Sequence, residues 1–243
     1  MTSFAGLPLT VKEHPRARRI LVKLVPGKGL VVVVPRGYRH SAVADILAEK
    51  RQWIEHTRDA LAKRGLDLSG QTPDPPDHLE FRAADRSHPV DYLDRPGRTT
   101  VTPNADRLLV RGPLADTPAT LRALQTFTVK RAREFALPRL DTLSRRLALP
   151  YAALRLRRQR TRWGSCSARG AISLNAKLLF LPPELVDQLL LHELCHTRHL
   201  NHSPAYWALV EHHQPDCKRL EHELSRGGKY VPAWFAWEGD GMA

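Results

Sequence analysis

One segment near the carboxy-terminal end constrains the fold more than any other, because it is apolar around nearly its whole circumference and yet carries ionisable groups. A helix that is apolar on all sides is buried. The apolar positions are Leu185, Val186, Leu189, Leu190, Leu191 and Leu194. The same segment contains His192-Glu193-Leu194-Cys195-His196, an H-E-x-x-H sequence. Burying these imidazoles and this carboxylate is costly unless partners satisfy them, and a metal ion would do so. The segment therefore predicts a buried helix with a metal site.

The spacing within this helix defines the candidate ligands. His192 and His196 lie about 40° apart around a helix axis, so their imidazoles point the same way. Glu193 is placed to hold and deprotonate a metal-activated water. Ser203 and Pro204 then favour a new helix start, which puts His202 just before a helix running to about His213. Catalytic zinc usually takes three protein ligands and leaves one position open. His202 is the expected third ligand, and a zinc-dependent hydrolase is the leading hypothesis.

Several other residues compete for roles at this site. His199 follows one turn after His196 and is expected near the mouth of the site or behind the ligands. Glu211 and Glu221 are alternative carboxylate ligands, although the segments that carry them are typical of exposed helical faces. The oxyanion that develops during hydrolysis needs a donor besides the metal. The candidates for that donor are Tyr206, His199 and Arg162.

The composition favours a globular protein of one large or two small domains. The chain has 243 residues, of which 42% are hydrophobic, and no apolar run approaches the ~20 residues of a membrane span. Three cysteines, Cys166, Cys195 and Cys217, are too few for a disulfide framework, and a cytoplasmic location is expected.

The charge balance raises the question of a polyanionic partner. The formal net charge is +13, and such an excess attracts nucleic acid at long range. The densest cluster lies directly before the predicted metal helix and consists of Arg155, Arg157, Arg158, Arg160 and Arg162. Nucleic acid is therefore a candidate partner, against the alternative that arginines are simply spread over the surface.

Periodicity indicates an α+β fold. Strands are expected at 19–25 and 30–34, joined by a turn at 26–29, and a helix at 41–63. Short strands follow at 78–82, 88–93, 99–102 and 107–111, and a long helix at 117–147 with a kink or break at Pro138. The recurrence of a hairpin and a helix at 19–63 and 98–147 indicates an internal repeat. A strand at 155–166 and a second at Ala171–Asn175 precede the metal helix. The latter is a candidate sheet edge for binding substrate as an added strand, or else an interior strand.

Taken in order, four motifs resemble the YgjP-like metallopeptidase family, which is related to the SprT-like zinc peptidases. They are Arg162-Trp163-Gly164-Ser165-Cys166-Ser167, Ile172-x-Leu174-Asn175, His192 to His196, and Asn201 to Trp207. The resemblance covers about residues 10–225. It implies a compact zincin-like core of the minigluzincin type, with a small sheet and two metal-binding helices. It also implies Zn²⁺ held by His192, His196 and His202, with Glu193 as the catalytic acid and base. Trp163 and Gly164 would wall the site and allow close backbone approach, or serve packing alone.

These observations define three regions and two competing functions. A β-rich region with helices is expected at 1–115, a zincin-like domain at 116–226 and an irregular tail at 227–243. The first function is a cytoplasmic zinc metallopeptidase acting on a protein or peptide, with no membrane partner. The alternative is a nucleic-acid-associated protein with a structural zinc, or a protease recruited to DNA as the SprT-like relatives are.

Overall fold

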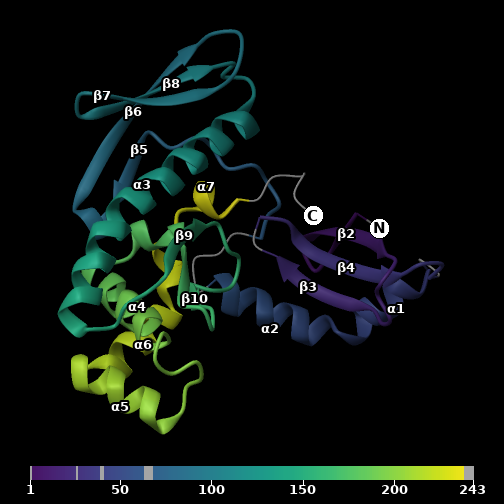
Figure 1. Cartoon of the computed structure of the whole chain (residues 1–243). Helices are drawn as coiled ribbons and strands as arrows, with labels where there is room; N and C mark the ends of the chain where they lie inside the picture. The colour runs from purple at the N-terminus through teal and green to yellow at the C-terminus, as the bar shows by residue number, and fades with distance from the viewer. Residues whose placement is uncertain (1, 26, 39–40, 63–67, 238–243) are drawn as a thin grey trace. The chain divides into compact units, whose positions relative to one another are not determined.

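The chain divides into two compact units. The computed structural model describes residues 2–25, 27–38, 41–62 and 68–237 (Figure 1). The first unit comprises Met1–Asp74 and Pro232–Ala243, and the second comprises Pro75–Val231. These units are defined by contacts between residues. The division of the chain into three regions at residues 115 and 226, which the sequence led us to expect, stays a prediction. No helix among the described residues is both long enough and apolar enough to cross a membrane.

A four-stranded sheet in the order β1-β2-β4-β3 forms the first unit. Its strands are β1 (Ser3–Phe4), β2 (Leu7–His14), β3 (Leu21–Val25) and β4 (Gly29–Pro35). β3 pairs antiparallel with β4, which confirms the predicted hairpin, although Pro26 in its turn lies outside the described residues. Alternate residues of β4 are fully buried, as the two-residue period of a strand requires. These are Leu30, Val32 and Val34.

Three helices complete the first unit: α1 (Ser41–Glu49), α2 (Arg51–Ala62) and α7 (Ala233–Ala236). The single helix predicted over 41–63 is therefore two helices end to end. Lys50 lies between them and still hydrogen-bonds to Ile46 and Ile54 through its backbone. Leu47 on α1 and Ile54 on α2 are completely buried in the same hydrophobic core as β4.

The second unit begins with a sheet of the same design. Its order is β5-β6-β8-β7. The strands are β5 (His78–Phe81), β6 (Arg86–Asp94), β7 (Thr100–Asn104) and β8 (Arg107–Gly112), with a 3₁₀ turn η1 (Arg82–Ala84). In both sheets the first pair is antiparallel, the central pair is parallel, the last pair is antiparallel, and a helix follows. This shared topology confirms the internal repeat.

The helix α3 (Thr117–Leu147) links this sheet to the rest of the unit and runs beside it in Figure 1. Asp116 caps its first turn by accepting a hydrogen bond from the Ala119 amide at 2.9 Å. The helix continues through Pro138, so the chain does not end the helix there. It stops at Ala148, whose left-handed backbone directs its N–H to carbonyls of the last turn.

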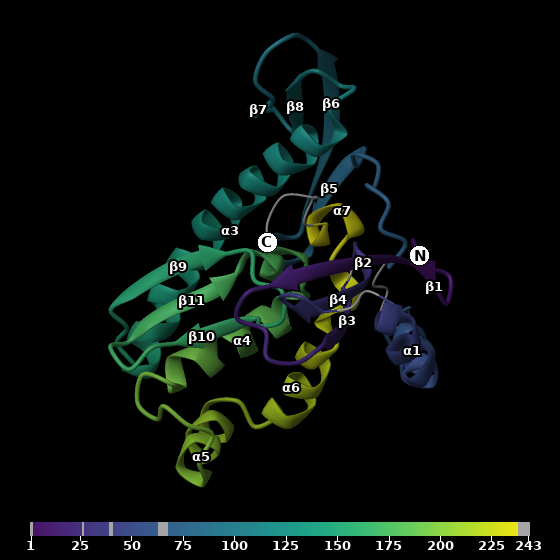
Figure 2. The ribbon, with the colours of Figure 1, turned by 90° about the vertical axis from the view of Figure 1, so that its right-hand side faces the viewer.

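A three-stranded sheet and three helices form the remainder of the second unit (Figure 2). The strands are β9 (Ala153–Arg157), β10 (Gly164–Cys166) and β11 (Ala171–Asn175), in the order β10-β11-β9. The turn η2 (Ala176–Phe180) leads to α4 (Pro183–Cys195), followed by α5 (Pro204–His213), α6 (Cys217–Ser225) and η3 (Gly227–Tyr230). The mixture of helices with small sheets confirms the predicted α+β class and its compact zincin-like core.

One strand prediction in this region is wrong, because the single strand expected over 155–166 is divided between β9 and β10. Two positions were considered for Ala171–Asn175, a sheet edge and the sheet interior, and β11 occupies the interior one between β10 and β9. The division has a visible cause in Asn175. Its side-chain amide donates to the backbone carbonyls of Gln159 and Arg162 at 2.7 and 2.8 Å. These bonds hold residues 158–163 as a loop outside the ladder.

The packing of η3 can be tested by substituting its two adjacent glycines, Gly227 and Gly228. A Cβ at Gly227 would fall 2.8 Å from the ring of Trp163 and 2.8 Å from Leu181, whereas a Cβ at Gly228 would meet nothing within 4 Å. We expect Gly227→Ala to destabilise the second unit by about 1–3 kcal/mol through overpacking. Gly228→Ala, the matched control, should change stability by less than about 0.5 kcal/mol. Thermal unfolding of both variants measures this, and equal melting temperatures would contradict the packing.

Candidate metal centre

Three imidazoles converge in the second unit. The Nε2 atom of His192 lies 3.3 Å from Nε2 of His196 and 3.3 Å from Nε2 of His202. Ligand nitrogens that share one tetrahedral zinc ion at 2.0–2.1 Å are separated by about 3.4 Å, so the spacing fits a single ion. The three residues form the one such group found among the described residues.

Local sequence positions each imidazole. His192 lies in the last turn of α4, and His196 directly follows that helix, one turn further on. The chain then turns and restarts as α5, whose first turn is capped by Ser203 accepting from the Tyr206 amide. This cap fixes His202 just before the helix. The predicted cap and the predicted helix boundary are both confirmed.

The imidazoles of His192 and His196 each donate a hydrogen bond through the nitrogen that faces away from the centre. His192 Nδ1 donates to Glu221 Oε1 at 2.8 Å, and His196 Nδ1 donates to the His199 carbonyl at 2.9 Å. Because both acceptors can only accept, the proton lies on Nδ1 and the Nε2 lone pair faces the centre. Gln188 also donates to Glu221 at 2.8 Å, which fixes the carboxylate. The arrangement presents ligand atoms in the state that binds metal.

Glu221 was expected on an exposed face, and that expectation is wrong. It lies on α6, and its side chain is 23% exposed between Gln188 and His192 of α4. Burial raises the pKa of Glu221, but the hydrogen bond and charge of His192, with the hydrogen bond of Gln188 and the charge of His202, lower it overall. Burial lowers the pKa of His192, and the hydrogen bond and charge of Glu221, with the charge of Glu193, raise it overall. Burial lowers the pKa of His196 and His202, which favours neutral imidazoles.

Two aromatic side chains support the imidazoles. The ring of Tyr206 stacks on His196 with centroids 4.5 Å apart, and the ring of Trp207 stacks on His202 at 5.7 Å. Tyr206 is fully buried, and its hydroxyl donates to the His192 carbonyl at 3.3 Å. Both residues therefore belong to the wall that orients the ligands.

Glu193 is buried beside the ligands with an unsatisfied oxygen. Its residue is 3% exposed, and its Oε2 has no hydrogen-bond partner within the described part of the chain. Burial raises the pKa of Glu193 to about 7, the charge of His192 lowers it and the charge of Glu221 raises it. Leaving a buried carboxylate oxygen without a partner carries a free-energy cost.

Gly164 makes room for this carboxylate. A Cβ at Gly164 would lie 2.7 Å from Glu193 Cδ and closer still to Oε1. No other residue type fits there without displacing the carboxylate, so the close approach considered for Gly164 is the arrangement found. Trp163, by contrast, packs against Gly227.

The remaining candidates lie in different environments. His199 contributes its backbone carbonyl to the site. Asn175 is 1% exposed and its amide is used within the protein, so it organises the loop before β10. Arg162 is exposed on that loop, next to β10. Glu211 pairs with Lys218 at 3.0 Å on an exposed face.

The three converging imidazoles could hold a metal ion, and comparison with known proteins gives the family of the chain. The family model "YgjP-like, metallopeptidase domain" matches residues 18–227. The chain therefore belongs to the YgjP-like metallopeptidase family. Among solved structures it is similar to the metallopeptidase zymogen abylysin of Pyrococcus abyssi. That similarity has 26% identity, a TM-score of 0.33, and covers 35% of this chain and 87% of that one. No curated protein matches the chain.

The contact between Gly164 and Glu193 predicts a selective defect. We expect Gly164→Ala to displace the carboxylate and lower peptide hydrolysis by on the order of a hundredfold, because small misplacements are costly in catalysis. Metal affinity, measured by competition with a chelator, should stay unchanged because the three imidazoles are untouched. Gly228→Ala adds the same carbon in open space and serves as the control. Full activity in Gly164→Ala would refute the role of this contact.

The hydrogen bond from His192 to Glu221 predicts a defect in metal affinity, whereas Gly164→Ala should leave metal affinity unchanged. Removing such an outer partner usually weakens metal binding about 10- to 100-fold. We expect Glu221→Gln to show this loss in a chelator competition. Glu223→Gln, on the same helix and paired with Arg219 instead, should bind metal as the wild type does. Equal affinities of the two variants would show that Glu221 does not orient the ligand.

Proposed function

We propose that the protein is a zinc-dependent peptidase in which Glu193 is the general base. The observation that carries the proposal is the free, buried oxygen of Glu193 beside three Nε2 atoms at the spacing of shared ligands. A bound zinc ion would supply Lewis acidity, polarising the scissile carbonyl and making water easier to deprotonate. The imidazoles of His192, His196 and His202 would hold it.

The ligand set supports zinc in a catalytic rather than a structural role. Neutral imidazoles suit zinc, and structural zinc sites are normally closed by four protein ligands. Within the described ranges, the cluster contains three ligand residues and no fourth. Cys195 lies in the same helix but is completely buried, and burial raises the pKa of its thiol to about 12. An open position therefore remains for substrate and water.

The environment of Glu193 supports its proposed role. A base works best when its pKa lies near the working pH, since it must accept a proton and then release it. Burial brings the pKa of Glu193 to about 7. Its carboxylate would take a proton from water and deliver it to the leaving amine. Gly164 would hold the carboxylate in place for both transfers.

The position of β10 supports binding of the substrate as an added strand. β10 lies at an edge of its sheet and carries Gly164, which contacts Glu193. A peptide extended along this edge would gain main-chain hydrogen bonds next to the general base. Because β11 is an interior strand, the edge that would bind substrate is that of β10.

Among the oxyanion donors considered, Arg162 has the most suitable placement. It is exposed on the loop that enters β10. The hydroxyl of Tyr206 is already used by the His192 carbonyl, and His199 contributes through its backbone. A guanidinium near the substrate edge would meet developing negative charge.

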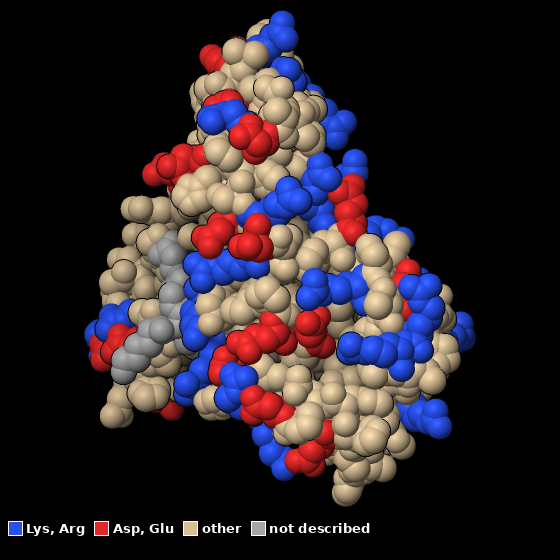
Figure 3. All heavy atoms as spheres, turned by 90° about the vertical axis from the view of Figure 1, so that its left-hand side faces the viewer, with Lys and Arg blue, Asp and Glu red and all other residues tan. Residues whose placement is uncertain are grey.

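Contact with nucleic acid is a second, separate proposal. Arg155 and Arg157 are exposed on β9, an edge strand, and Arg160 is exposed in the loop that follows. Figure 3 views the side opposite to that of Figure 2, and on that side basic and acidic side chains lie interspersed. Mixed charge there weakens the attraction for a polyanion, which leaves the arginines of β9 as the candidate contact. Peptide hydrolysis is therefore the better supported function.

The substitution Glu193→Gln tests the proposed function. We expect it to abolish hydrolysis of a peptide library, because an amide cannot accept the proton, while one equivalent of zinc remains bound. Glu184→Gln, in the first turn of the same helix, is the control and should retain activity. Residual hydrolysis by Glu193→Gln at the wild-type rate would refute the assignment.

A further inference from the structure

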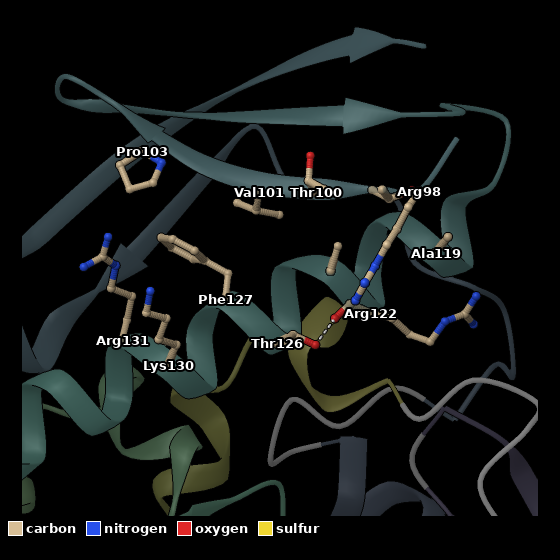
Figure 4. Close-up of a pocket in the computed structure, with 12 residues that line it drawn as sticks. Arg98, Thr100, Val101, Pro103, Ala119, Arg122, Thr126, Phe127, Lys130 and Arg131 are labelled. Carbon is tan, nitrogen blue, oxygen red and sulfur yellow. Dashed lines mark hydrogen bonds between the residues drawn. The ribbon is translucent and has the colours of Figure 1, made fainter. Parts of the chain in front are cut away.

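A groove between β7 and the first half of α3 lies apart from the metal centre. Its volume is about 650 Å³, and it is lined by residues between 98 and 103 and between 119 and 131 (Figure 4). None of these residues belongs to the metal site. We propose that this groove binds an extended acidic segment of another protein.

Charge is the first argument. The lining contains four basic residues and no acidic one. The basic residues are Arg98, Arg122, Lys130 and Arg131. Arg122 and Lys130 are eight residues apart on α3, which places them about two turns and about 12 Å apart along the helix. Glu134 partly neutralises one end of the groove, at 2.5 Å from Arg131 and 4.0 Å from Lys130. The remaining positive charge attracts a ligand with several carboxylates along its length.

Shape and lining favour a peptide over a nucleic-acid strand. The lining includes small apolar side chains on both β7 and α3, among them Val101, Ala119 and Ala123, which suit aliphatic side chains. Single-stranded nucleic acid is held by aromatic rings on which bases stack. Phe127 is the aromatic residue of the lining, and the guanidinium of Arg131 already lies 5.0 Å above its ring. The guanidinium of Arg131 therefore occupies one face of the Phe127 ring, which hinders stacking of a base there.

The wall formed by β7 points to an extended ligand. β7 is the edge strand of its sheet, and Val101 and Pro103 share one face because alternate residues of a strand do. The segment from Arg98 to Pro103 spans about 17 Å, the length of some five residues of extended peptide. Pro103 has no N–H, so continuous main-chain pairing is interrupted, and the cations provide most of the recognition. Carboxylates would face Arg98, Arg122 and Lys130.

Binding can be measured without turnover, so this proposal does not depend on the peptidase chemistry. The full chain carrying Glu193→Gln would be titrated with a fluorescent peptide of about eight alternating Glu and Val residues. Adding Arg122→Gln and Lys130→Gln should raise Kd about tenfold, because two exposed ionic contacts are lost. Arg145→Gln with Arg169→Gln removes the same charge at exposed positions outside the groove and should leave Kd unchanged.

Three results would overturn the proposal. The first is an equal loss of affinity in both double variants, which would mean attraction by net charge alone. The second is the absence of peptide binding. The third is tighter binding of a single-stranded oligonucleotide than of the peptide, with that binding lost in Arg122→Gln/Lys130→Gln, which would assign the groove to nucleic acid.

Discussion

The structure around the metal centre depends on one constraint, the burial of polar side chains in α4. His192 and Glu193 lie in a helix whose leucines and Val186 are buried in the apolar core, so each buried polar atom beside them needs a partner or a function. The surrounding elements meet that need. α6 supplies Glu221 to one imidazole, the turn after α4 supplies the His199 carbonyl to the next, and β10 supplies Gly164 to the carboxylate. Two buried oxygens of α4, Gln188 Oε1 and Glu193 Oε2, have no hydrogen-bond partner among the described residues, and Glu193 directly follows the first of the three converging histidines.

The sequence predicted the parts of this site that depend on local geometry. Helical spacing fixes His192 and His196, and the Ser203 cap fixes His202, so these positions follow from neighbouring residues. Glu221 is 29 residues from His192, and its role arises only when α6 packs against α4. Local periodicity gives such a residue the same appearance as any exposed glutamate. Gly164 likewise has no local signal that names Glu193 as its neighbour.

The wrong prediction of a single strand over 155–166 has the same origin. Residues 155–166 have the composition of one strand, but the amide of Asn175 takes up two backbone carbonyls between β9 and β10. Tertiary hydrogen bonds here override local propensity. The recurring hairpin and helix of the internal repeat could be recognised in the sequence. The parallel pairs β2-β4 and β6-β8, which set the order and direction of the strands, could not, because they join strands that do not follow each other in the chain. In the second copy, the helix α3 and the edge strand β7 also form the basic groove.

The most direct test of the central claim is X-ray absorption at the zinc edge of the zinc-loaded protein. We expect a first shell of three imidazole nitrogens at about 2.0–2.1 Å and one oxygen ligand, with no sulfur. A shell containing sulfur at about 2.3 Å, or four protein ligands, would contradict an open site formed by His192, His196 and His202.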